Sequence, residues 1–253
     1  MELDQQKLSQ HRLQPPRPGG ASELRRIDQL LLVGPELPLH PTLETIFESD
    51  CQKPIDLFWL SFADSETYLR GEDLVRQLKK NFRGYLLGRF ETLPERALID
   101  RAYAAGLDLL ELPLTTIDDR QLALLDYARS VFPPWGVIAT LPALGPTGPW
   151  IDALAQRGII PLLHLSGVAA ELPDSQVSRG FQQLLRSWQR YKIKVKPLRP
   201  LLEHTTPLRF PPKPRGVGAL LGRVDEARLR TSSDLRRLLR VREVAASFES
   251  AGL

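Results

Sequence analysis

The sequence contains very little cysteine, and this scarcity excludes several classes of protein. Its 253 residues include one cysteine, Cys51, so the chain cannot form an internal disulfide or a metal site that needs two of its own thiolates. Long apolar runs are also missing, because the longest, 55–62 and 159–165, fall far short of the roughly 20 residues of a membrane helix. The first residues lack the apolar centre of a secretory signal. These absences predict a cytoplasmic protein with no membrane partner.

Motifs of several well-known chemistries are missing as well. The sequence has no GxGxxG or GxxxxGK[ST] motif, which removes the main support for a nucleotide-binding doubly wound sheet. It has no GxSxG motif for a serine nucleophile. None of its four histidines lies three or four residues from another, and no CxxC pair occurs. We therefore expect no metal site.

Short apolar runs alternate with amphipathic segments along most of the chain. The seven runs are 29–34, 55–62, 84–90, 107–114, 136–144, 159–165 and 192–198. No tight hairpin signal joins consecutive runs, and a connection between parallel neighbours takes about a dozen residues or more. The alternation predicts an α/β protein with a parallel (β/α) barrel, closed or incomplete, of six to eight strands.

Composition sets the expected boundaries. Residues 1–20 are polar and end in a stretch rich in proline and glycine, which predicts a mobile leader. The barrel is expected over 21–208. For residues 209–253 we expect a basic extended segment and a C-terminal helix, Asp234–Phe248, packed on or beside the barrel. Ten basic and three acidic residues fall between Arg209 and Arg242, so the positive charge is concentrated there.

Candidate site residues are read off the carboxyl ends of the predicted strands, where a parallel barrel gathers its reactive groups. They include acids, bases and cations, as a pocket for a polar small molecule would. The set comprises Asp64, Glu91, Glu111, Thr115, Thr140, His164, Lys194, Lys196 and Arg199.

Two members of this set interrupt apolar runs. Glu111 lies within 107–114, where a carboxylate is costly unless it is paired or hydrogen-bonded. It is either a ligand-binding group or the structural partner of Arg89 or Arg199. His164 follows two leucines, and a lone histidine on an apolar strand is more often a core group than a catalyst.

Three lysines alternate with apolar residues in the last run. The alternation puts Lys192, Lys194 and Lys196 on one face of the predicted strand. A lysine inside a barrel can form a Schiff base when burial lowers its pKa. If the other face points inward, all three lysines contact water. We place Lys192 outside and leave Lys194 and Lys196 open.

Two segments carry a resemblance to a known family. The stretch Ala104–Glu111 with Thr115, and the stretch Val195–Pro200 followed by Thr206-Pro207-Leu208, resemble the barrel core of radical S-adenosylmethionine enzymes, with the biotin synthase branch nearest. The resemblance runs from about residue 55 to residue 208. It implies that Glu111 and Thr115 touch the nucleoside cofactor.

The rest of the expected cofactor-binding set follows from this resemblance and from the strand ends. Glu91 falls near the place where the family holds the methionine amino group. Thr140 and Arg199 complete the set. The cofactor implied is S-adenosylmethionine or a related nucleoside.

The chain departs from this family at its cluster loop. The family holds an iron–sulfur cluster with three cysteines in a CxxxCxxC loop after the first strand. Here that place is taken by Ala63–Arg70, which contains no cysteine. We therefore expect a relative that cannot hold the cluster or cleave S-adenosylmethionine reductively.

Three functions remain open from the sequence. The first is a non-catalytic accessory protein, a pseudoenzyme that binds a small molecule at the carboxyl face or docks onto a cluster-bearing barrel enzyme. The second is a cluster-independent lyase or aldolase, with Lys194 or Lys196 as the Schiff-base amine and Glu91, Glu111 or His164 as the proton shuttle. The third is phosphate or nucleic-acid binding through the basic C-terminal segment, where scarce aromatic side chains disfavour nucleic acid.

Overall fold

Seven strands form one sheet that is parallel except at one edge. In space they follow their order in the chain, and the β2–β3 pair is antiparallel whereas every later pair is parallel. A doubly wound sheet reverses its strand order at a switch point, and this sheet contains no reversal. The α/β class and the parallel sheet are thus confirmed. The strands are β2 (Leu24–Ile27), β3 (Leu30–Val33), β4 (Leu57–Phe62), β5 (Tyr85–Phe90), β6 (Leu109–Pro113), β7 (Val137–Pro142) and β8 (Ile160–His164).

The structure is a computed structural model that describes residues 1–143, 147–165, 172–212, 231, 234–235 and 237. The chain divides into two units, Met1–Phe210 and Pro211–Leu253. Most of the predicted basic segment and of the predicted helix Asp234–Phe248 lies outside the described residues. The sheet and all the site residues discussed below belong to the first unit.

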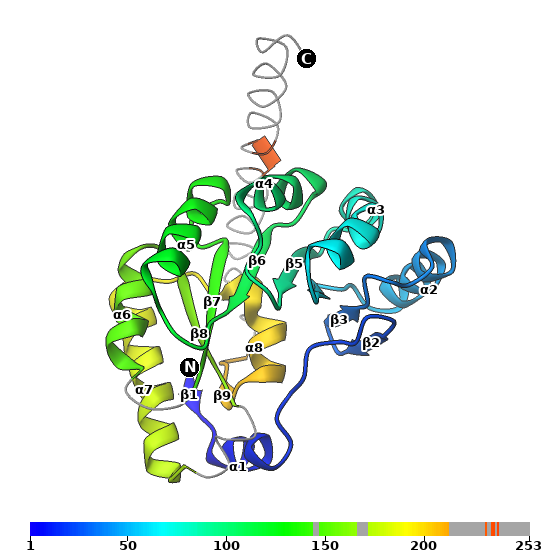
Figure 1. The fold of residues 1–253 in the computed structure, drawn as a ribbon. Coiled ribbons are helices and arrows are strands. Elements are labelled where there is room, and N and C mark those ends of the chain that lie inside the picture. The colour runs from blue at the N-terminus through cyan, green and yellow to red at the C-terminus, as the bar shows by residue number, and fades with distance from the viewer. Residues whose placement is uncertain (144–146, 166–171, 213–230, 232–233, 236, 238–253) are drawn as a thin grey trace. The chain divides into compact units, whose positions relative to one another are not determined.

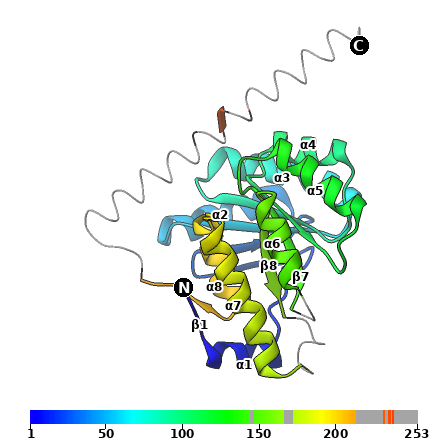
Figure 2. The same ribbon diagram turned by 90° about the vertical axis from the view of Figure 1, so that its left-hand side faces the viewer.

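Helices α2 to α6 connect the successive parallel strands, and α7 follows the last strand, β8. When all crossovers have the same hand and the strands follow their order in the chain, the helices lie on one face of the sheet. Figure 1 shows α2 to α7 following one another along that face. Side by side in Figure 2, α6 and α7 are joined by a hydrogen bond from Gln183 Nε2 to Asp152 Oδ2 at 3.1 Å. The helices are α2 (Leu39–Gln52), α3 (Ser65–Asn81), α4 (Arg96–Ala105), α5 (Asp119–Val131), α6 (Gly148–Gln156) and α7 (Asp174–Arg190).

Local sequence explains where the helices begin. The carboxylate of Asp64 caps α3 by accepting a hydrogen bond from the Thr67 amide at 2.8 Å. Asp118 and Gln121 form a capping box at the start of α5. The strands between the helices are almost entirely buried, as expected for a sheet covered on both faces.

The seventh apolar run does not form a strand, and that part of the prediction is wrong. Residue Lys192 takes a left-handed φ of 52° where α7 ends, and residues 196–198 form the short 3-10 helix η2 (Lys196–Leu198). A further helix, α8 (Arg199–Thr205), follows directly. Prolines near the starts of η2 and α8 lack the backbone donor that a central strand would need. The buried apolar residues of this run therefore pack from a turn.

Strand β2 of the sheet is missing from the sequence prediction. Strands β2 and β3 form a hairpin, with Ile27 paired to Leu30 across Asp28 and Gln29. Asp28 adopts a φ of 54°, a left-handed conformation that an aspartate tolerates in a tight turn. A glycine at this turn would have been the usual signal, and none is present.

Residues 2–13 form a strand and a helix within the segment that the sequence predicts as a mobile leader. Strand β1 (Glu2–Leu3) pairs with β9 (Leu208–Arg209), and helix α1 (Gln5–Leu13) follows. The Leu8 side chain of α1 is only 1% exposed. Since Leu8 is the one buried residue of this helix, α1 has no apolar stripe that a sequence reading could detect.

A pair of histidines gives this N-terminal segment a predicted pH dependence. Burial, helped by Lys7 and His204, lowers the pKa of His11 to about 4, and burial and Arg25 lower the pKa of His204. An unfolded histidine has a pKa of about 6.5, so the unfolded chain binds more protons as the pH falls below that value. The free energy of unfolding is therefore unaffected by these histidines above about pH 6.5. It decreases as the pH falls toward 4, because the unfolded chain then binds protons that the folded chain does not.

We expect His11→Gln to reduce this loss of stability in acid. Between pH 7 and pH 4.5, the variant should lose about 1–2 kcal/mol less free energy of unfolding than the natural chain, after allowance for partial exposure. Urea unfolding at a series of pH values measures the difference. His40→Gln, at an exposed position, is the control and should follow the natural chain. Equal slopes for all three proteins would contradict this account of His11.

Candidate functional site

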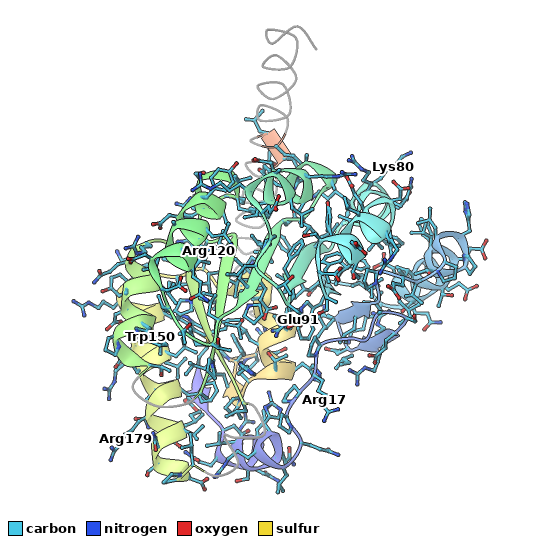
Figure 3. The ribbon with its side chains drawn as sticks, in the orientation of Figure 1. Arg17, Lys80, Glu91, Arg120, Trp150 and Arg179 are labelled. Atoms are coloured by element: carbon cyan, nitrogen blue, oxygen red, sulfur yellow. The ribbon has the colours of Figure 1, made fainter. Side chains whose placement is uncertain are left out.

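Polar side chains meet on one face of the sheet near the carboxyl ends of its strands. Ser61 of β4, Arg89 of β5 and Glu111 of β6 are direct neighbours across the two strand pairs. Because side chains alternate along a strand, this row faces the same side as Trp59 and Thr140. Figure 3 shows the nearby Glu91 near the middle of the molecule, whereas Lys80 and Arg179 lie at its periphery.

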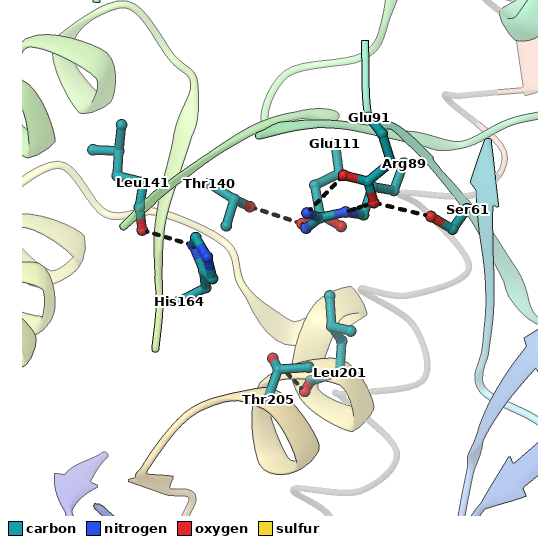
Figure 4. A network of polar contacts seen from close by, with 9 residues as sticks. All are labelled: Ser61, Arg89, Glu91, Glu111, Thr140, Leu141, His164, Leu201 and Thr205. Atoms are coloured by element: carbon teal, nitrogen blue, oxygen red, sulfur yellow. Dashed lines mark hydrogen bonds and ion pairs between the residues drawn. The ribbon is translucent and has the colours of Figure 1, made fainter. Parts of the chain in front are cut away.

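The Glu111 carboxylate is almost completely buried and has two partners on one oxygen. Its Oε1 accepts hydrogen bonds from Arg89 Nη1 at 2.6 Å and from Thr140 Oγ1 at 2.8 Å (Figure 4). The Glu111 side chain is 3% exposed and that of Arg89 is 11% exposed. Arg89 therefore provides the charge that compensates a carboxylate in the middle of a buried strand.

Arg89 also binds a second carboxylate, that of Glu91. Its Nε donates to Glu91 Oε1 at 2.6 Å, and the Ser61 hydroxyl donates to the same oxygen at 3.1 Å. Burial would raise the pKa of Glu91, but these hydrogen bonds and the charge of Arg89 lower it overall. For Arg89, burial disfavours the charge, but the attraction of Glu111 and Glu91 raises its pKa. Arg89 and Glu91 are therefore ionised at neutral pH.

His164 faces this cluster as a neutral imidazole. Its Nδ1 lies 3.3 Å from the Leu141 carbonyl oxygen, which can only accept a hydrogen bond, so Nδ1 carries the proton. Burial and the charge of Arg89 lower the pKa of His164 below its usual value. The other nitrogen, Nε2, is thus a hydrogen-bond acceptor. With a neutral His164, the two carboxyl groups of Glu91 and Glu111 share one cation, Arg89.

A small cavity of about 50 Å³ lies against the cluster. One water occupies about 10–15 Å³ on this measure, so the cavity has room for roughly three or four water-sized atoms. Part of its wall comes from α8 and from the N-terminal segment. Its lining residues are Pro16, Pro18, Trp59, Arg89, Glu111, Thr140, Leu162, Leu163, His164, Leu165, Leu201, Thr205 and Thr206.

Two buried polar atoms of the lining residues lack a hydrogen-bond partner in the described part of the chain. They are Glu111 Oε2 and Trp59 Nε1. A buried polar atom without a partner costs about 1–3 kcal/mol, and more when it is charged, so such atoms are rare in folded proteins. Two residues that line the cavity thus carry a buried polar atom with no described partner, one a carboxylate acceptor and the other an indole donor.

The structure brings together four of the eight residues that the sequence proposes as catalytic or cofactor-binding. Glu111, Thr140 and His164 line the cavity, and Glu91 is bound to Arg89. The remaining four lie elsewhere. Thr115 is exposed in the loop after β6, Lys194 and Lys196 are exposed, and Arg199 pairs with Glu203 at 2.8 Å. The prediction that Lys194 and Lys196 lie on a barrel strand is wrong, because the seventh run forms no strand.

Three members of the site were absent from the sequence-based set. The sequence suggests Arg89 only as a structural partner of Glu111, and it does not distinguish Trp59 or Ser61 from their neighbours. A signal was available for Arg89, because it precedes Glu91 by two residues and so shares its face of a strand. Trp59 gave none, because an aromatic residue in an apolar run is typical of a core.

No described helix is both long enough and apolar enough to cross a membrane. Within the described ranges, no three His, Cys, Asp or Glu side chains are grouped as a metal ion would require.

Comparisons of the chain with protein-family models, curated proteins and solved structures find no match.

Proposed function

We propose that the protein is a binding protein for a small polar molecule, held at the carboxyl ends of β4–β8, and that it has an accessory role without an iron–sulfur cluster. The observation that carries the proposal is the unpartnered Glu111 Oε2, buried in the wall of the cavity. A ligand that donates a hydrogen bond to this oxygen would remove the cost of burying it.

The strand order supports this location for a ligand site. Parallel strands in sequential order, with their crossover helices on the outside, are typical of a barrel or of an incomplete barrel. We interpret the sheet as an incomplete barrel whose interior is filled by α8 and the N-terminal segment. In barrel proteins the carboxyl ends of the strands form the binding face, where Glu111, Thr140 and His164 lie.

The segment after β4 supports the part of the proposal that concerns the missing cluster. Residues 63–70 contain the Asp64 cap and the first turn of α3, and no cysteine. The chain's single thiol, Cys51, is exposed on α2, before β4. The resemblance to radical S-adenosylmethionine enzymes thus points to a relative that keeps the sheet and lacks the cluster ligands.

The size of the cavity favours a ligand much smaller than a nucleoside. Pockets for drug-sized molecules measure about 300–1,000 Å³. The cavity here is about 50 Å³, so S-adenosylmethionine would have to displace α8 or the Pro16–Pro18 segment. A molecule of a few heavy atoms fits without such a displacement.

A thermal-shift screen with small polar compounds tests the proposal. A ligand at one hundred times its Kd stabilises the folded state by about 2.7 kcal/mol, which corresponds to a shift of several degrees. We expect at least one compound to stabilise the natural chain and to have a much smaller effect on Glu111→Gln. The proposal fails if no compound stabilises the chain, or if every stabilising compound acts equally on the variant.

A further inference from the structure

The residues that line the cavity carry an uneven set of hydrogen-bonding groups. Glu111 Oε2 and His164 Nε2 are acceptors, and Trp59 Nε1 is a donor. The two threonine hydroxyls of the α8 side already donate to backbone carbonyls, Thr205 to Leu201 and Thr206 to Leu202. A complementary ligand therefore needs at least two donor hydrogens and one acceptor atom.

The charge of the site points in the same direction. Two carboxylates, Glu91 and Glu111, face one guanidinium, Arg89, and the neighbouring imidazole is neutral. Only Glu111 and Arg89 of these charged groups line the cavity, and the side chain of Glu91 is 38% exposed. Because Arg89 is shared with Glu91, a cation at the free oxygen of Glu111 is favoured over an anion. The complementary donor group is therefore positively charged.

The geometry distinguishes among cations. A guanidinium binds a carboxylate best through both oxygens, but Glu111 Oε1 is already occupied by Arg89 and Thr140. Calcium takes six to eight oxygen ligands and magnesium takes six, and the cavity offers one free carboxylate oxygen. An ammonium group is a compact charge with three donors, and it needs only single acceptors such as Glu111 Oε2 and His164 Nε2.

We propose that the ligand of this cavity is a small primary ammonium compound with a hydrogen-bond-accepting oxygen a few bonds from the nitrogen. The ammonium group donates to Glu111 Oε2 and His164 Nε2, and the Trp59 indole donates to the ligand oxygen. This assignment rests on the proposed function, because it names the ligand class of the same site. Leucine and proline side chains form much of the remaining lining, which limits the ligand to a short carbon chain.

Indole NMR signals provide a direct test on the full chain. The protein has four tryptophans, and the Trp59 resonance is assigned by its loss in Trp59→Phe. The probe is ethanolamine, with ethylene glycol as the neutral control of similar size. We expect ethanolamine to shift the Trp59 signal in a saturable way, with an apparent affinity at least tenfold higher than that of ethylene glycol. The Trp188 indole already donates to the Pro161 carbonyl at 3.1 Å, so its signal should not move.

Matched variants separate recognition by Glu111 from a general loss of carboxylate charge. Glu111→Gln should weaken ethanolamine binding at least tenfold. Glu72 is another buried carboxylate, but its two oxygens are bound to Arg76 and Arg101, so Glu72→Gln should bind as the natural chain does. If Glu111→Gln does not fold, calorimetry with Trp59→Phe provides the second test, and this variant should also bind ethanolamine more weakly.

The outcomes distinguish this inference from the function on which it rests. If ethanolamine leaves the Trp59 signal in place while a neutral or anionic compound shifts it, the ammonium assignment is overturned and the binding function stands. If no compound of any charge shifts that signal, both are overturned. Equal binding of ethanolamine to the natural chain and to Glu111→Gln would also overturn the assignment.

Discussion

Replacing Arg89 with methionine is expected to lower the free energy of unfolding by about 3–5 kcal/mol, the usual cost of breaking a buried ion pair. The variant leaves the carboxylates of Glu91 and Glu111 close together without a compensating cation. The Glu111 side chain is 3% exposed, so water cannot replace the lost hydrogen bond. Urea-induced unfolding followed by circular dichroism measures the change.

An exposed ion pair provides the control for the Arg89 variant. Arg70 and Glu36 lie 2.7 Å apart, and their side chains are 57% and 37% exposed. Arg70→Met should cost less than about 1 kcal/mol, because water screens and replaces such a pair. If the two methionine variants lose similar amounts of stability, Arg89 does not hold the site together as described here.

The second large effect is expected in the N-terminal segment. Leu8→Ala should lower the free energy of unfolding by about 2–4 kcal/mol, because it removes a buried side chain and leaves a cavity. Thermal and urea unfolding of the full chain measure this loss.

The same helix supplies the control for this variant. Leu13 is 87% exposed, so Leu13→Ala should leave the stability nearly unchanged. An equally small effect of both substitutions would mean that α1 does not pack on the rest of the unit.

The strands were the most predictable part of the fold. Six apolar runs became β3 to β8, because a strand covered on both faces must be apolar throughout. The seventh run, 192–198, has apolar residues at alternate positions, as a strand with one buried face would. It nevertheless forms a turn and a short 3-10 helix, and its buried side chains belong to these. Pattern alone does not separate these two cases when the segment ends in prolines. The sequence does not reveal the turn at Asp28, because aspartate adopts a left-handed φ less readily than glycine and is a weaker turn signal.

The site was predictable where a charged side chain interrupted an apolar run. Glu111 and His164 were recognised in this way, because a polar group in a buried strand needs a partner. The partner itself depends on register, which the sequence does not reveal. Arg89 lies opposite Glu111 across the β5–β6 pair, whereas Arg199, the other proposed partner, is on α8 and binds Glu203.

The most direct test of the binding site is a crystal structure of the full chain grown with ethanolamine, refined beside crystals grown without it. The account predicts density for a molecule other than water within hydrogen-bond distance of both Glu111 Oε2 and Trp59 Nε1. It also predicts that Arg89 keeps its contacts with both carboxylates. A cavity that is empty, or that holds only ordered water in both crystals, would contradict the account.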